Sequence, residues 1–351
     1  MESTEIREAL KAMYGGENKP VTDGNYDKSL AVKCVNGTFV GRKKENIIAY
    51  RGIPYVGRQP VGKLRWKAPV DVTPRDGVYE AFYNAKSALG NGQLETGSLY
   101  YMDEDCLYLN VFKSDDATPK KPVMVWIHGG AFEAGGTLDP GFDCHNFVKE
   151  NPDVIVVTVA YRLGVMGFLH LSHLPDGKDY PDAQNLGLMD QMMALKWIHE
   201  NIASFGGDPD NVTIWGESAG GDSVTTLPLI EGSHKYFKRV IAQSGTPVLS
   251  KTTKQAIDDT NEFMDILGCK TVADLQKIEV EKLLAALETL GDMRIGPERD
   301  GKYLPLSQIK SLRVQPSVYT PQGCCGRGIP VLKVRLEYGA ESPVILMIEQ
   351  E

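Results

Sequence analysis

Ser218 is the centre of the segment Gly216-Glu217-Ser218-Ala219-Gly220, which directly follows a short apolar run at residues 212–215. A serine at a sharp turn from strand to helix exposes its hydroxyl for attack on an acyl group. The turn requires glycine two residues before and two after the serine, because larger side chains would collide there. It also aims the Ala219 N–H, at the positive end of the helix, toward a developing oxyanion. We therefore predict Ser218 to be a nucleophile; a purely structural glycine turn is the alternative.

A second loop, Trp126-Ile127-His128-Gly129-Gly130-Ala131-Phe132, closes another apolar run at residues 123–127. Its small residues allow backbone N–H groups to approach a substrate carbonyl. Loops of this H-G-G type commonly complement a serine turn of the kind described above. We predict that the loop supplies further oxyanion donors; an ordinary turn that ends a strand is the alternative.

The elements that must position these loops are expected to alternate between strand and helix. Apolar runs predict parallel core strands at residues 107–112, 123–127, 154–159 and 212–215, with a shorter one at 240–242. Helical patterns separate most of them, the clearest at 188–202, and residues 252–290 are also expected to be helical. Residues 29–55 alternate around Asn36-Gly37 and predict antiparallel strands at a sheet edge. The sequence therefore predicts an α/β fold with a mostly parallel central sheet covered by helices, with sites at the carboxyl ends of strands. We expect residues 291–323 to form loops.

Composition excludes several classes of function. The chain has 351 residues, 42% of them hydrophobic, and a formal charge of −8, so binding to nucleic acid or to anionic membranes is not expected. No apolar run reaches the roughly 20 residues of a membrane helix. Residues 1–16 contain no apolar run of signal-peptide length and are expected to form a short amphipathic helix, within an N-terminal helix and lead-in at residues 1–28. The six cysteines are scattered and are expected to be free thiols, with no spacing typical of a metal site. We therefore expect a cytoplasmic protein without metal or cofactor.

Further blocks give the chain a resemblance to the type-B carboxylesterase family, which includes the cholinesterases. The blocks are Arg51-Gly52-Ile53-Pro54-Tyr55, Leu64-Arg65-Trp66, Glu104-Asp105-Cys106-Leu107-Tyr108-Leu109-Asn110-Val111, the His128 loop, Tyr161-Arg162-Leu163-Gly164, residues 205–221 and Gln243-Ser244-Gly245. Together they cover roughly residues 30–310.

This resemblance implies the α/β-hydrolase fold and the activity of a carboxylic-ester hydrolase (EC 3.1.1.-) that acts on small-molecule esters. It implies an oxyanion hole made by the N–H groups of Gly130, Ala131 and Ala219. It also implies that Glu217 and Ser244 lie behind the site and tune its buried charge; the alternative for Glu217 is a carboxylate that is merely satisfied within the turn.

Two departures from the family bear on the cellular environment and on the range of ester substrates. Cys106 occupies the position of half a disulfide in secreted relatives, yet no cysteine lies between Cys34 and Cys106. We expect an unbridged loop, which suits a reducing cytoplasm. Choline-binding relatives place a tryptophan in this loop as a cation–π platform. None lies between Trp66 and Trp126 here, so choline esters are disfavoured.

The family's catalytic groups occur in the order serine, acid, histidine. The six histidines are at positions 128, 145, 170, 173, 199 and 234, and His234, the one that follows Ser218, is expected in a surface turn. We therefore identify no catalytic histidine. Glu337, after the apolar residues 329–332, is the candidate acid; the alternative is a solvated glutamate in a tail.

Agreement with the family fades beyond about Ser311, so residues 312–351 are predicted to be a divergent tail within a single domain of residues 1–351, truncated at its carboxyl end. Three interpretations remain open: an ester hydrolase whose activity is doubtful without its histidine, a catalytically inactive cholinesterase-like binding protein, and a truncated gene product. The sequence leaves the oligomeric state open.

Overall fold

The computed structural model describes residues 16–90, 101–245 and 250–306, and the backbone of the strands at 312–316, 331–336 and 344–348. Residues 1–15, where most of the N-terminal helix is expected, lie outside the described residues. Glu337, Cys324 and Cys325 also lie outside them.

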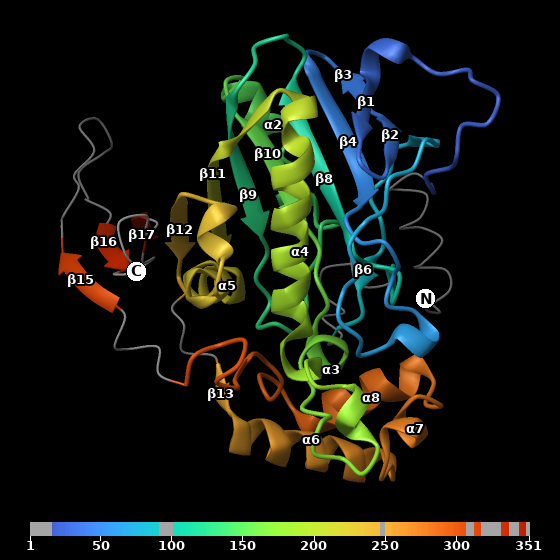
Figure 1. The fold of residues 1–351 in the computed structure, drawn as a ribbon, viewed down its shortest axis with the longest axis vertical. Coiled ribbons are helices and arrows are strands. Elements are labelled where there is room, and N and C mark those ends of the chain that lie inside the picture. The colour runs from blue at the N-terminus through green and yellow to red at the C-terminus, as the bar shows by residue number, and fades with distance from the viewer. Residues whose placement is uncertain are drawn as a thin grey trace.

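Ten described strands form one large sheet, which runs through the middle of the molecule (Figure 1). Their order is β15-β16-β17-β12-β11-β9-β10-β8-β4-β3. Their bounds are Leu312–Pro316 (β15), Val331–Leu336 (β16), Val344–Ile348 (β17), Arg239–Gln243 (β12), Gly207–Glu217 (β11), Lys121–Ile127 (β9), Ile155–Val159 (β10), Tyr108–Ser114 (β8), Ile47–Pro54 (β4) and Arg42–Lys44 (β3).

The centre of this sheet is parallel and both of its flanks are antiparallel. Strands β10, β9, β11 and β12 run in one direction, as predicted for the core. Strand β17, which lies in the predicted tail and was not expected, continues the parallel order beside β12. The prediction of a parallel strand at residues 107–112 is wrong, because β8 is antiparallel to both β10 and β4. Only residues 115–120 connect β8 to β9, and a link this short cannot contain the crossover helix that parallel strands require.

The predicted N-terminal antiparallel strands are confirmed. Strands β1 (Ala31–Cys34) and β2 (Gly37–Val40) form a hairpin in which Cys34 pairs with Gly37, and β5 (Val78–Glu80) joins β2 in a separate small sheet. Strand β4 then forms the antiparallel flank of the large sheet together with β3 and β8. The expectation of loops throughout 291–323 is wrong at β14 (Glu298–Arg299) and at β15. Both are held by non-local pairing, with β13 (Lys251–Thr252) and β16 respectively, and not by a local sequence pattern.

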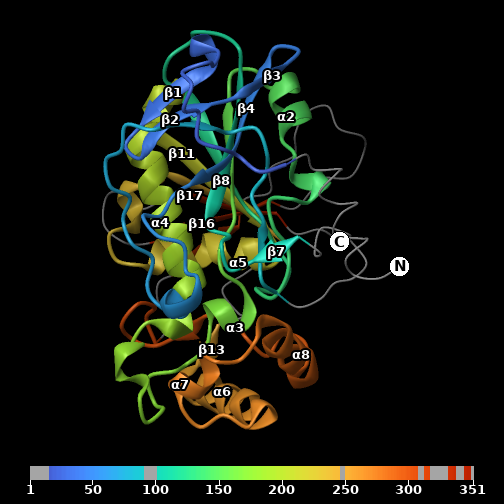
Figure 2. The same cartoon turned by 90° about the vertical axis from the view of Figure 1, so that its right-hand side faces the viewer.

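Helices cover both faces of the sheet, with α4 on one face and α2 on the other (Figure 2). The bounds are His145–Glu150 (α2), Gly164–Gly167 (α3), Leu186–Asn201 (α4), Ala219–Thr226 (α5), Thr253–Leu267 (α6), Val272–Leu275 (α7) and Val280–Leu290 (α8). Helix α4 confirms the helix predicted at 188–202, and α6 to α8, gathered at one end of the molecule in both views, confirm the helical region at 252–290.

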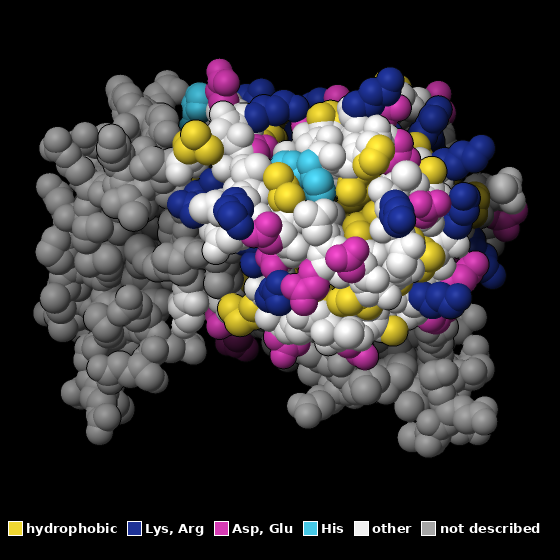
Figure 3. All heavy atoms as spheres, turned by 90° about the horizontal axis from the view of Figure 1, so that it is seen from below, with side chains coloured by type: hydrophobic (Ala, Val, Ile, Leu, Met, Phe, Trp, Pro, Cys, Tyr) yellow, Lys and Arg dark blue, Asp and Glu magenta, His cyan; other side chains and the backbone are white. Residues whose placement is uncertain are grey.

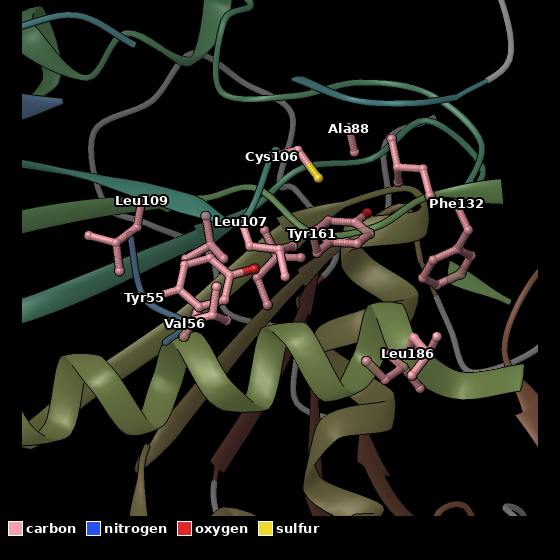
Figure 4. Close-up of a cluster of buried hydrophobic side chains, with 14 of the residues drawn as sticks. Tyr55, Val56, Ala88, Cys106, Leu107, Leu109, Phe132, Tyr161 and Leu186 are labelled. Carbon is pink, nitrogen blue, oxygen red and sulfur yellow. The ribbon is translucent and has the colours of Figure 1, made fainter. Parts of the chain in front are cut away.

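Aromatic side chains connect the core to the loops above the sheet. Figure 4 shows Tyr55, Leu107, Tyr161 and Leu186 packed between the sheet and α4. Both tyrosines are fully buried, and each hydroxyl finds a backbone acceptor, as buried polar groups must. The Tyr55 hydroxyl donates to Ala160 O at 2.6 Å, and the Tyr161 hydroxyl donates to His128 O at 2.8 Å. The core therefore fixes the beginning of the His128 loop.

A buried ion pair joins the segment that follows β10 to α4. Arg162 donates from Nε and Nη2 to the two carboxylate oxygens of Asp190, each at 2.7 Å, and both side chains are almost fully buried. Such a two-pronged pair fixes the relative position of the two elements in a way that a single contact does not.

None of the described helices has the length and apolar content needed to cross a bilayer. The expected free thiols are confirmed at the four described cysteines, which are Cys34, Cys106, Cys144 and Cys269. All four are buried, and burial raises the pKa of the Cys34 and Cys144 thiols to about 12. These thiols are therefore protonated and unreactive near neutral pH.

Candidate active site

Ser218 lies between β11 and α5 in a strained backbone conformation. Its φ is 54° and its ψ is −121°, a region that residues with a side chain rarely adopt. The turn is held from both sides: the Ser218 N–H donates to Gln243 O, and the Ser218 carbonyl accepts from the Asp222 N–H, each at 2.9 Å. The strand-to-helix turn expected from the sequence is therefore present.

The two glycines of the turn lie against the end of β9, the neighbouring strand. A β-carbon built on Gly216 would lie 2.5 Å from the Gly220 carbonyl and 2.6 Å from the Ile127 oxygen. One built on Gly220 would lie 2.1 Å from the same Ile127 oxygen. Both positions therefore exclude any side chain, which is the physical reason for the G-x-S-x-G spacing.

The loop after β9 lies directly beside Ser218. A β-carbon built on Gly129 would lie 3.2 Å from the Ser218 β-carbon. The next three residues all have positive φ: 106° at Gly130, 56° at Ala131 and 61° at Phe132. The Gly130 carbonyl accepts from the N–H groups of both Glu133 and Ala134 at 2.9 Å, which closes the turn. Strain of this kind, about 1–3 kcal/mol for each non-glycine residue, typically accompanies functional loops.

Glu133 anchors this loop to a distant part of the chain, a contact that the sequence reasoning missed. Its side chain is buried, and its carboxylate oxygens accept the N–H groups of Met293 at 3.0 Å and Ile295 at 3.1 Å. The other end of the loop is held by the Gly164 N–H, which donates to Phe132 O at 2.7 Å. An acidic residue between Phe132 and Ala134, in an otherwise apolar loop, was the signal that could have found it.

His128 is a buried residue that supports the loop. Its ring stacks on Tyr161, with centroids 4.5 Å apart, and Nδ1 lies 2.8 Å from the Gly129 oxygen. Because a carbonyl oxygen can only accept, Nδ1 carries the proton in this contact. Burial lowers the pKa of His128 to about 4, so the imidazole is neutral near neutral pH. Its Nε2 has no hydrogen-bond partner among the described residues.

Glu217 and Ser244 also lie near Ser218. Glu217 is half-buried, and its Oε2 would lie 3.2 Å from a β-carbon on Gly129. Strand β11 places Glu217 opposite Gln243 of β12, so Ser244 follows in the next row, beside the serine turn. Ser244 is exposed and has a φ of 49°. Their influence on charge in the site stays a prediction.

The described residues provide no histidine that bonds to the Ser218 hydroxyl. His234 is exposed in the turn before β12, as expected of a surface residue. Strand β16, which precedes Glu337, is antiparallel to β17, and its Arg335 lies in the row of Val344 and Arg239, where β12 begins. Ser218 lies at the opposite edge, where β12 ends. The direction of β16 therefore gives no support to Glu337 as the acid.

One cavity of about 170 Å³ lies elsewhere, in the N-terminal part of the fold. Phe39, Pro54 and Tyr79 are among the residues that line it, and none of the residues predicted for the site does. The presence of a cavity does not by itself indicate a catalytic group. We therefore locate the candidate active site from the strained turn at Ser218 and not from this cavity.

Comparison with known proteins places these features in a family context. The profile of the carboxylesterase family matches residues 28–325. The para-nitrobenzyl esterase of Bacillus subtilis is 38% identical over 306 residues, which are 84% of this chain and 60% of that protein. Liver carboxylesterase B-1 of Rattus norvegicus is 32% identical over 312 residues, which are 80% of this chain and 53% of that protein.

Solved structures agree. A thermophilic PNB esterase matches with a TM-score of 0.73 and 37% identity, over 79% of this chain and 59% of that one. A carboxylesterase of Geobacillus stearothermophilus matches with a TM-score of 0.72 and 39% identity, over 78% of this chain and 56% of that one. The chain thus spans between half and two thirds of the length of the curated relatives that it matches.

Proposed function

Because the chain belongs to the carboxylesterase family, we propose that it carries the nucleophile and the oxyanion donors of a carboxylic-ester hydrolase. The fold is the α/β-hydrolase fold, as the resemblance implied. The observation that carries the proposal is the strained turn at Ser218, with a φ of 54°, lying against Gly129 of the loop after β9.

In this proposal the Ser218 Oγ attacks the carbonyl carbon of a small-molecule ester. The carbonyl oxygen becomes an oxyanion, which accepts hydrogen bonds from the N–H groups of Gly130, Ala131 and Ala219. The C–O bond to the alcohol then breaks and leaves an acyl group on Ser218, which water removes in a second attack. Glu217 and Ser244 are proposed to adjust the charge around this centre.

The proton of Ser218 needs an acceptor, and no described histidine bonds to this hydroxyl. Loss of the base from a serine triad lowers the rate by about 10⁶-fold, or about 8 kcal/mol of transition-state stabilisation. We therefore expect this chain to react with strong electrophiles at Ser218 and to turn esters over slowly. The strained turn and the oxyanion donors do not depend on the base.

Labelling by a fluorophosphonate, located by peptide mass spectrometry, tests this proposal. We expect the phosphonyl group on Ser218, and the Ser218→Ala variant should lose that modified peptide. Ser204→Ala is the matched control, because Ser204 is exposed and lies in the turn after α4, on a different element. Because the oxyanion donors act without the base, a folded wild-type chain in which Ser218 is labelled no faster than Ser204 would contradict the nucleophile. That result would favour a non-catalytic binding protein with this fold.

A further inference from the structure

Away from Ser218, a serine, a histidine and an acid lie in line at a different place in the molecule. The Ser172 Oγ is 3.0 Å from Nε2 of His170, and Nδ1 of His170 is 2.6 Å from Oε2 of Glu298. Ser172 and His170 follow α3, whereas Glu298 belongs to the short strand β14 (Glu298–Arg299). We propose that Ser172 is an activated nucleophile that takes the acyl group from small, reactive carboxylic esters, with His170 as its base.

The hydrogen bonds set the tautomer that this chemistry needs. An ionised carboxylate can only accept, so Nδ1 of His170 carries the proton and donates it to Glu298. In the neutral imidazole, Nε2 then has a free lone pair and accepts the Ser172 hydroxyl. This is the arrangement in which a serine hydroxyl loses its proton to a histidine during attack.

The negative charge of the buried Glu298 carboxylate acts mainly on the imidazole of His170. Glu298 is fully buried, and its second oxygen, Oε1, has no hydrogen-bond partner among the described residues. The side chain of His170 is 11% exposed. A buried carboxylate whose described partner is one imidazole stabilises the imidazolium that forms when Ser172 gives up its proton. Glu298 is therefore a positioning residue for His170.

The backbone around the pair is also fixed. The His170 N–H donates to the Thr260 hydroxyl at 3.1 Å. The side chain of Asn185 holds the backbone of Glu298 from both sides, donating to its carbonyl and accepting from its N–H, each at 2.9 Å. The base and the acid therefore keep their geometry without help from a substrate.

Ser172 itself is exposed, so small molecules in solution can reach it. Figure 3 shows the end of the molecule that carries α6, with exposed histidine side chains among apolar and acidic ones. Within the described residues, the backbone N–H groups of Ser172 and His173 donate no hydrogen bond, so both are available to a developing oxyanion, whereas the His173 ring donates from Nδ1 to His170 O at 2.8 Å. The alternative is that the Ser172 contact only ties down the chain after α3.

The reaction balances without a further reactant. The Ser172 Oγ forms a bond to the ester carbonyl carbon while its proton passes to Nε2 of His170. The tetrahedral intermediate collapses, its bond to the alkoxy oxygen breaks, and the alcohol leaves with that proton. Water then gives a proton to Nε2 and attacks the acyl carbon, and Ser172 leaves with the proton.

The experiment uses the full chain carrying Ser218→Ala, so that the first site contributes nothing. Fluorophosphonate labelling is followed over time by peptide mass spectrometry at Ser172 and at Ser204, an exposed serine without a histidine partner among the described residues. We expect Ser172 to react about 100-fold faster than Ser204, the usual contribution of a general base, and His170→Gln to remove that advantage. An advantage below about tenfold, or one that His170→Gln leaves unchanged, would overturn the proposal.

The role of Glu298 has its own readout. Two-bond ¹H–¹⁵N NMR spectra should show His170 with its proton on Nδ1. Glu298→Gln should slow the labelling of Ser172, because a neutral amide stabilises the imidazolium less than a carboxylate does. Glu262→Gln is the control, because Glu262 is exposed and pairs with Arg294. Urea unfolding of each variant verifies that it is folded. A labelling rate that does not change in folded Glu298→Gln would contradict the role of Glu298. Because Ser218 is absent throughout, failure of either proposal leaves the other standing.

Discussion

A β-carbon added to Gly220 would lie 2.1 Å from the carbonyl oxygen of Ile127. The added β-carbon would be attached directly to the backbone at the start of α5, and the Ile127 oxygen is a backbone atom at the end of β9. No side chain can therefore rotate to relieve the contact. The serine turn and the neighbouring strand therefore leave no room for a β-carbon at Gly220.

We expect Gly220→Ala to push the serine turn away from β9. The variant should lose about 3 kcal/mol of unfolding free energy, and it should be labelled more slowly at Ser218. Urea unfolding and fluorophosphonate kinetics measure the two effects. Gly141→Ala is the control, because its new β-carbon would meet only a side-chain oxygen of Asp139, at 3.2 Å. Equal stability of the two variants would contradict the steric argument.

Glu133 gives a second prediction, on the loop that faces Ser218. Glu133→Gln replaces one carboxylate oxygen by an amide group that cannot accept the N–H of Met293 or Ile295. We expect a loss of about 1–3 kcal/mol of unfolding free energy and slower labelling at Ser218, because the loop loses its anchor. Glu45→Gln, which breaks an exposed pair with Lys149, should cost less than about 1 kcal/mol. If Glu133→Gln is labelled at the same rate as the wild type, Glu133 does not influence the geometry at Ser218.

Strand and helix positions and the parallel direction of the core strands were largely predictable from the sequence, whereas the direction of β8 was predicted wrongly. The apolar runs at residues 123–127, 154–159 and 212–215 were correctly placed. β10 is buried along its whole length, and β9 and β11 alternate between buried and half-buried positions at these residues, so all three strands are predominantly apolar. The same pattern at residues 107–112 says nothing about direction, and the short link to β9 was the overlooked signal. β15 has no periodic pattern long enough to be recognised.

The serine turn was predictable because its glycines are local in sequence. The contacts that hold the surrounding loops were not. Glu133 contacts residues about 160 positions later in the chain, and His170 contacts Glu298, which lies 128 positions later. No spacing rule links residues so far apart, so their pairing emerges only from the fold.

His128 makes the stability depend on pH. Its pKa lies at about 4 in the folded chain, below its ordinary 6.5, because burial disfavours the charged ring. The unfolded chain therefore binds more protons between pH 6.5 and 4, and stability falls as the pH falls through that window, by about 3 kcal/mol in total. Above pH 6.5 the ring is neutral in both states and contributes no slope.

Urea unfolding at a series of pH values measures this loss. His128→Gln should lack it, whereas His234→Gln should retain it because His234 is exposed. Parallel stability curves for the wild type and His128→Gln would contradict the burial argument.

Glu337 tests the candidate acid. Strand β16 ends at the edge of the sheet where β12 begins, and Ser218 follows a strand that ends at the other edge. We therefore expect Glu337→Gln to leave the rate of phosphonylation at Ser218 within about twofold of the wild type. A decrease of about 100-fold or more would instead identify Glu337 as the acid that the sequence suggested.

The pairing of β12 with β17 has a consequence during synthesis. Strand β17 lies about 100 residues after β12 in the chain. At ribosomal rates of about 5–20 residues per second, the edge of β12 that pairs with β17 stays unpaired for about 5–20 seconds after β12 is synthesised. An unpaired strand edge is a template for other chains. Nascent copies of this protein are therefore most prone to aggregate in that interval, and chaperones that bind extended segments would have their main opportunity there.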